Sequence, residues 1–151
     1  MYQKILVPVD GSAPSTRGLL EAIKLARDDH AQLRLVHVVN TIVSAIDYAA
    51  GPGSTIDPST RTNDADVAAL KRAESLVTQN GLNSETVLLS TVTDNVGELI
   101  VRQAKEWNAD IIVMGTHGRG GLSRLILGSN AEHVLRHTQV PVLFVRGQPG
   151  N

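Results

Sequence analysis

Short apolar runs rich in β-branched residues alternate along this chain with longer segments whose apolar residues recur at helical spacing. A run that is apolar throughout is typical of a strand buried on both faces, and strands separated by helices pair in parallel through right-handed crossovers. The order therefore predicts an α/β fold, a single doubly wound sheet of five parallel strands with helices on both faces. The expected strands span residues 4–9, 33–39, 85–89, 110–115 and 140–145.

Polar residues that commonly cap helices stand at the start of each expected helix. Asn95 and Glu98 form a capping-box pattern before the clearest amphipathic segment, residues 96–107. The pair Asn80-Gly81 is suited to a left-handed turn at the end of another helix. The expected N-caps are Ser12, Asn63 and Asn95, and the last helix is expected over residues 129–137.

The size and composition of the chain exclude several kinds of protein. Its 151 residues are near the common size of one domain, so we expect residues 1–151 to form a single domain. A formal net charge of −1 offers no field that attracts nucleic acid, and zero cysteines exclude disulfides and thiolate zinc sites. The apolar stretch near the start is too short for a signal peptide or a membrane span. We expect a cytoplasmic protein with no nucleic-acid partner and no membrane segment.

Glycines gather after the fourth expected strand. Ligands of open doubly wound sheets bind beyond the carboxyl ends of the strands, which directs attention to residues 115–121 and to Gly128-Ser129. Four glycines in residues 115–121 leave backbone N–H groups uncovered, and a helix N-terminus adds unpaired N–H groups and a positive dipole. Both features favour phosphate binding. A structural role, with the glycines forming turns and Ser129 capping the helix, explains the pattern equally well.

The spacing Gly115-x2-Gly118-x9-Gly128-Ser129 resembles the ATP-binding signature of the universal stress protein family. Residues 5–12, 37–39 and 140–143 are similar to further segments of that family, so the resemblance covers nearly the whole chain. It implies one universal-stress-protein-like, nucleotide-binding domain with strand order 3-2-1-4-5, in which Asp10 lies beside Gly115. It also implies bound ATP, with Mg²⁺, and a regulatory or stress-response role.

The resemblance assigns roles to residues at the ends of the strands. Gly115 and Gly118 would let the backbone approach the ribose and phosphates, and Gly128 and Ser129 would bind the phosphates. Asp10 would hold the ribose or the metal ion. Val38 would meet the adenine through its main chain, Pro8 and Val9 would line the same wall, and Met114, His117 and Asn130 would be secondary contacts.

Structural roles stay open for three of these residues: a turn-forming role for Asp10, a buried strand position for Val38 and core packing for Met114. Arg119 and Arg124 are positioned to offset phosphate charge, although loop arginines are commonly only solvated.

Motifs of other nucleotide-binding and catalytic proteins are absent from the sequence. The chain lacks the Rossmann glycine fingerprint, the Walker lysine pattern and the Gly-x-Ser-x-Gly elbow. His133 and His137 are four residues apart, but without a third ligand a role at the helix dipole is favoured over metal binding. We expect a nucleotide-binding protein rather than a dedicated enzyme. Slow ATP hydrolysis or phosphoryl transfer, and binding of another adenine nucleotide such as cyclic AMP, stay open.

Two further features bear on regulation and assembly. Residues 40–62 lack regular periodicity and form a loop long enough to act as a lid. Residues 142–145 are apolar and would leave an unpaired strand at the sheet edge, which predicts self-association. The resemblance implies a two-fold homodimer through this edge.

Overall fold

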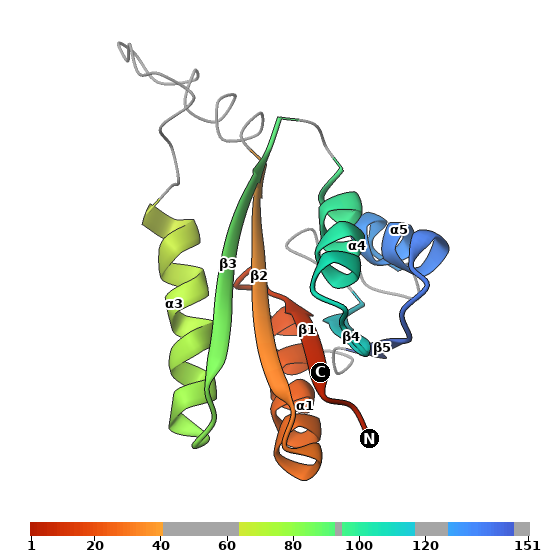
Figure 1. The fold of residues 1–151 in the computed structure, drawn as a ribbon. Helices are drawn as coiled ribbons and strands as arrows, with labels where there is room; N and C mark the ends of the chain where they lie inside the picture. Colours follow the sequence, from red (N-terminus) through yellow and green to blue (C-terminus); the bar gives the residue numbers. More distant parts are fainter. Residues whose placement is uncertain (41–63, 93–94, 117–126, 147–151) are drawn as a thin grey trace.

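The computed structural model describes residues 1–40, 64–92, 95–116 and 127–146, which contain a five-stranded parallel sheet (Figure 1). The strand order β3-β2-β1-β4-β5 confirms the predicted fold class and topology. The strands are β1 (Lys4–Pro8), β2 (Gln32–Asn40), β3 (Ser84–Thr91), β4 (Ile111–Gly115) and β5 (Val142–Val145). The helices are α1 (Ala13–Asp29), α3 (Asp64–Gln79), α4 (Val96–Glu106) and α5 (Ser129–His137).

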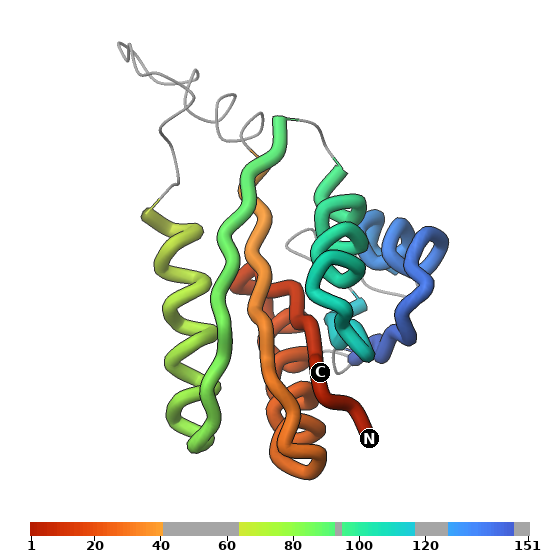
Figure 2. The backbone as a smooth tube through the Cα atoms, in the orientation of Figure 1, coloured from red at the N-terminus to blue at the C-terminus, as the bar shows by residue number. Residues whose placement is uncertain are grey.

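β1 lies at the centre of the sheet because it pairs with β2 on one side and with β4 on the other. Ile5 stands opposite Leu33 of β2 and opposite Ile111 of β4. β2 and β3 run side by side along their length, as the backbone trace shows (Figure 2). This topology brings the turn after β1 next to the turn after β4, which is a distant segment of the chain.

Alternate strand residues enter two apolar layers. Ile5 and Val7 of β1 pack with α1 and α3, whereas Leu6 packs with α4 and α5. The helices α3 and α4 accordingly lie on opposite sides of the sheet (Figure 1). Their placement confirms the prediction that helices cover both faces. Further members of the layers are Leu19, Ile23, Leu70 and Val77 in the first, and Ile100, Met114 and Val134 in the second.

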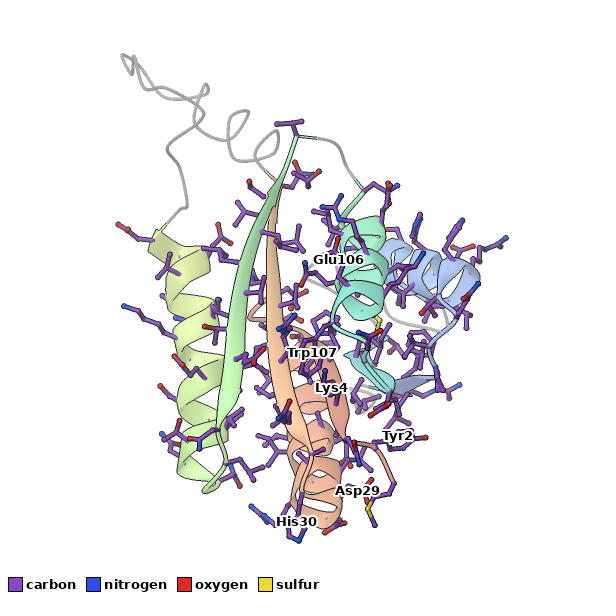
Figure 3. The ribbon with its side chains drawn as sticks, viewed as in Figure 1. Tyr2, Lys4, Asp29, His30, Glu106 and Trp107 are labelled. Carbon is purple, nitrogen blue, oxygen red and sulfur yellow. The ribbon has the colours of Figure 1, made fainter. Side chains whose placement is uncertain are left out.

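Contacts near the first residues of the chain tie the amino ends of the strands to the ends of two helices (Figure 3). The Tyr2 N–H donates to the Asp29 carboxylate at 2.7 Å. Lys4 Nζ donates to the Trp107 carbonyl oxygen at 3.2 Å, and its ammonium lies 5.5 Å from the indole centroid. The predicted site residues lie at the other end of the sheet.

Two predicted N-caps are confirmed. Ser12 Oγ accepts from the Ser15 N–H at 3.2 Å at the start of α1, and Asn95 Oδ1 accepts from the Glu98 N–H at 3.3 Å at the start of α4. Gly81, with a φ of 75°, follows α3 in the predicted left-handed conformation.

The structural alternative for Ser129, a cap at the start of α5, is wrong. Gly128 is the N-cap, no side chain provides a capping hydrogen bond, and Ser129 is the first helical residue. The reason is that the Gly128 carbonyl oxygen already accepts from the Glu132 N–H at 2.8 Å, so the first helical ring begins at Gly128.

Some predicted features lie outside the described residues. They are the Asn63 cap, residues 41–62 of the expected loop, and the segment 117–126. Among the helices that the structure does describe, none combines the length and apolar character needed to cross a membrane.

Candidate functional site

The turn after β1 is organised by the Asp10 side chain. Asp10 Oδ1 accepts from the Ser12 N–H at 2.9 Å, and the Asp10 N–H donates to Ser15 Oγ at 3.1 Å. Gly11 between them has a φ of 78°, a conformation that glycine adopts without strain. The turn-forming role considered for Asp10 is therefore present, and it fixes the carboxylate at the carboxyl end of β1.

The end of β4 packs directly against the start of α1. A Cβ added to Gly115 would lie 2.6 Å from the backbone carbon of Pro14, and one added to Gly18 would lie 3.0 Å from the Gly115 nitrogen. The absence of a side chain at Gly115 thus lets a helix approach a strand. This packing places the turn containing Asp10 beside the end of β4, as the strand order implied.

The start of α5 is tied to the same strand end. The Gly128 N–H donates to the Thr116 carbonyl oxygen at 2.8 Å, and the Thr116 N–H donates to the Val145 carbonyl oxygen of β5 at 3.1 Å. Because the first N–H that bonds within the helix belongs to Glu132, the amides of Ser129, Asn130 and Ala131 have no partner inside the helix. The Gly128 amide itself is already used.

Helix dipoles add to this first turn. The helices α1, α3, α4 and α5 each follow a parallel strand, so all of them begin at the carboxyl edge of the sheet. The α4 and α5 starts are in close contact, since a Cβ on Gly97 would lie 2.7 Å from His133 Cβ and 3.1 Å from the Asn130 carbonyl oxygen. Positive dipole ends gathered at one edge favour an anionic ligand there.

The main-chain groups at the ends of β1 and β2 differ in their hydrogen bonding. The Val9 N–H donates to the Val36 carbonyl oxygen at 2.8 Å, and the Val9 carbonyl oxygen lies 2.6 Å from His37 Nδ1. The pairing of β1 with β2 ends at Pro8 and Val36. Since Val36 directs its carbonyl toward β1, Val38 directs its main chain to the same side, beyond the last paired residue.

The predicted hydrophobic contacts differ in exposure. Met114 is 6% exposed and belongs to the apolar layer beneath α4 and α5, as the core-packing alternative expects. Val9 is likewise buried, whereas Pro8 and Val38 are half-buried. The structure brings Asp10, Gly115, Gly128, Ser129 and Asn130 to one edge, while His117 and Gly118 lie outside the described residues.

The sequence analysis missed a buried polar pair beneath this edge. His37 of β2 is 2% exposed and Asp66 of α3 is 7% exposed, and His37 Nε2 lies 2.7 Å from Asp66 Oδ1. A histidine inside an apolar strand was a visible signal. Nothing in the sequence indicated its partner, because the partner lies 29 residues further along the chain.

The two histidines of α5 contact each other and the helix backbone. Their rings are stacked with centroids 4.0 Å apart, and His137 Nδ1 donates to the His133 carbonyl oxygen at 2.8 Å. This contact with a carbonyl near the helix end matches the dipole role. No group of three or more potential metal ligands occurs among the side chains of the described segments.

Comparison with known proteins relates this chain to one family. The model of the "Universal stress protein family" matches residues 1–146. A universal stress protein of Methanocaldococcus jannaschii is 35% identical over 146 residues, covering 97% of this chain and 83% of the relative.

Two similar structures contain nucleotides. One, a universal stress protein from Archaeoglobus fulgidus in complex with dAMP, is 28% identical with a TM-score of 0.65 and covers 95% of this chain and 97% of its own. The other, a universal stress protein in complex with cAMP, is 23% identical with a TM-score of 0.68 and covers 96% and 97%.

Proposed function

The chain belongs to the universal stress protein family, and from this membership we propose that it binds an adenine nucleotide, ATP with Mg²⁺, beyond the carboxyl ends of β1 and β4. The first turn of α5 carries the proposal. The amides from Ser129 to Ala131 precede the first intrahelical donor, and Gly128 fixes this turn to the end of β4. Such a turn binds phosphate through its amides and its dipole. The dAMP and cAMP complexes of similar proteins support adenine as the base.

We assign the phosphates to the amides of Ser129 and Asn130, with Gly118 completing the site. Asp10 offers a carboxylate to the ribose or to Mg²⁺, which prefers oxygen ligands. Gly128 supports the phosphate site by holding α5 in place, because its amide already bonds to Thr116.

The adenine is assigned to the ends of β1 and β2. The main chain of Val38 lies past the last residue pair between these strands, which suits hydrogen bonds to the base edge. Pro8 and Val9 would contact the adenine only through apolar atoms. The N–H and the carbonyl oxygen of Val9 already form hydrogen bonds within the protein. Met114 and His117 remain secondary contacts in this assignment.

The nucleotide acts as a bound ligand in this proposal, with a regulatory role in a cytoplasmic stress response. A ligand that binds only the folded state stabilises it by mass action, so nucleotide supply would control the amount of ordered protein. A turnover assay separates this role from catalysis. Steady multiple turnover of ATP that Asp10→Ala abolishes would establish a hydrolase or phosphoryl-transfer enzyme instead.

Ser129→Glu tests the phosphate site without weakening the helix. A carboxylate in the first turn of a helix is stabilising, but here it would repel a phosphate bound to the same amides. We expect Mg-ATP affinity, measured by calorimetry, to fall by about tenfold or more at unchanged thermal stability. Ser75→Glu, the same change on the exposed surface of α3, is the control and should bind as the parent does.

The same calorimetry identifies the nucleotide. Mg-ATP should bind more tightly than AMP or cAMP, because more phosphate oxygens reach the α5 amides. If Ser129→Glu and the parent bound every nucleotide equally, the first turn of α5 would have no ligand role.

A further inference from the structure

His37 connects two elements that meet beneath the proposed nucleotide site. Its Nδ1 lies 2.6 Å from the Val9 carbonyl oxygen, and its Nε2 lies 2.7 Å from Asp66 Oδ1 in the first turn of α3. The ring is 2% exposed, so water does not compete for either nitrogen. Both distances are those of strong hydrogen bonds.

The two partners determine the role of each ring nitrogen. A carbonyl oxygen only accepts, so Nδ1 must carry a proton and donate a hydrogen bond to Val9. The Asp66 contact at Nε2 holds the ring in the orientation that this hydrogen bond needs.

The accepting carbonyl belongs to the peptide that leads into the site. Val9 is held on both sides by β2, through its N–H to Val36 and through its carbonyl to His37. The next residue is Asp10, whose carboxylate is fixed in the same turn by Ser12. On β2, Val38 follows His37 directly. The ring thus fixes the relative position of the two segments assigned to the base and the ribose.

We propose that His37 is a positioning residue for the nucleotide, which it serves without touching the ligand, by donating a hydrogen bond to the Val9 carbonyl from a ring that Asp66 orients. This inference rests on the proposed function and adds to it a buried hydrogen bond that tight binding requires. Without that hydrogen bond, the peptide before Asp10 would lose its anchor to the ring.

Within the described elements, few other titratable groups lie around the ring. By strand alternation, β1, β2 and β3 place only apolar or hydroxyl side chains beside His37 on the face toward α3, with Leu88 as its β3 partner. Asp64, Lys71 and Arg72 of α3 are exposed, and Asp10 stands in the turn after β1. Asp66 is the titratable group that the structure places in contact with the ring.

Two substitutions separate the two ring contacts. Asparagine carries an amide donor near the position of Nδ1, and glutamine carries one near the position of Nε2. His37→Asn therefore keeps a donor for Val9 but leaves the Asp66 carboxylate without its partner from β2. His37→Gln keeps a donor for Asp66 and leaves the Val9 carbonyl without its own.

The proposal predicts that the two variants differ in affinity. His37→Gln should bind Mg-ATP about threefold to tenfold more weakly than the parent, whereas His37→Asn should bind nearly as the parent does. Thermal unfolding of both variants measures their loss of stability separately. A merely structural histidine would lower stability in both variants without this affinity difference.

Asp66→Asn provides a second test that does not depend on replacing His37. An asparagine amide can donate to Nε2, so a neutral imidazole then satisfies both contacts. Asp66→Asn should therefore bind Mg-ATP nearly as the parent does, because both ring contacts keep a donor and an acceptor.

The outcomes are distinct. If the parent binds no adenine nucleotide, the proposed function is overturned and this inference with it. If the parent binds, equal affinities for His37→Asn and His37→Gln, or clearly weaker binding by Asp66→Asn than by the parent, would overturn the role of His37 alone.

Discussion

At the scale of single residues, Asp110 shows how one carboxylate fixes the entry of the chain into the sheet. The N–H groups of Gln3 and Lys4 both donate to Asp110 Oδ2 at 2.8 Å. These hydrogen bonds, and to a smaller extent the charge of Lys4, hold the pKa of Asp110 below its ordinary value of 3.8. Because the folded-state pKa is depressed, the stabilisation is present above the ordinary value and is lost as pH falls through the folded-state value.

Asp110→Asn should therefore lower the free energy of unfolding near neutral pH, by less than about 1 kcal/mol because the site is exposed. Urea unfolding should show the difference from the parent shrinking as the solution is acidified below the ordinary pKa of the carboxyl. Asp28→Asn, at the exposed end of α1, is the control and should cost no stability, since an acid there opposes the helix dipole. A deficit for Asp110→Asn that stayed constant with pH would contradict this explanation.

At the scale of elements, Ser12 and Ser129 form a matched pair of helix starts. Ser12 Oγ caps α1, whereas α5 begins at Gly128 without a side-chain cap. Ser12→Ala should thus lower the free energy of unfolding by about 1 kcal/mol, and Ser129→Ala should leave it nearly unchanged. Chemical denaturation of both variants measures the contrast, and an equal loss in the two would mean that Ser129 also caps its helix.

The sequence predicted the strands and helices well because each is buried on a defined face. Apolar runs identified the strands, and the resemblance supplied their order. The predicted strands corresponding to β2 and β3 end too early. Backbone pairing between the two strands continues to Asn40 and Thr91, beyond the apolar residues. The predicted last strand begins too early, at residue 140, whereas β5 begins at Val142. The Val140 N–H donates to Thr138 Oγ1 at 3.0 Å instead of pairing within the sheet.

The candidate site was predictable only in part. Glycine spacing identified the turn near α5, but it did not reveal that Gly115 accommodates Pro14. The contact between His37 and Asp66 was beyond sequence reasoning, because it depends on how α3 lies against β2 after a long intervening segment. Local patterns predict elements, whereas contacts between elements depend on packing that a single sequence does not display.

At the scale of the whole molecule, β5 lies at the sheet edge, and Leu143 on it is 38% exposed. We propose that two copies of the chain associate through this edge. Sedimentation equilibrium at micromolar concentration should show a dimer, and Leu143→Lys should shift it toward monomer by charging the interface. Leu20→Lys, at an equally exposed position (39%) on α1, should leave the dimer intact. A monomeric parent would contradict the assembly.

Nucleotide binding is the central claim, and the amides of the first α5 turn report on it directly. Titrating ¹⁵N-labelled protein with Mg-ATP should shift the amide resonances of Ser129, Asn130 and Ala131 saturably, together with that of Asp10 in the turn after β1. Saturable shifts that left the α5 amides unmoved, or no shifts at all, would contradict the account.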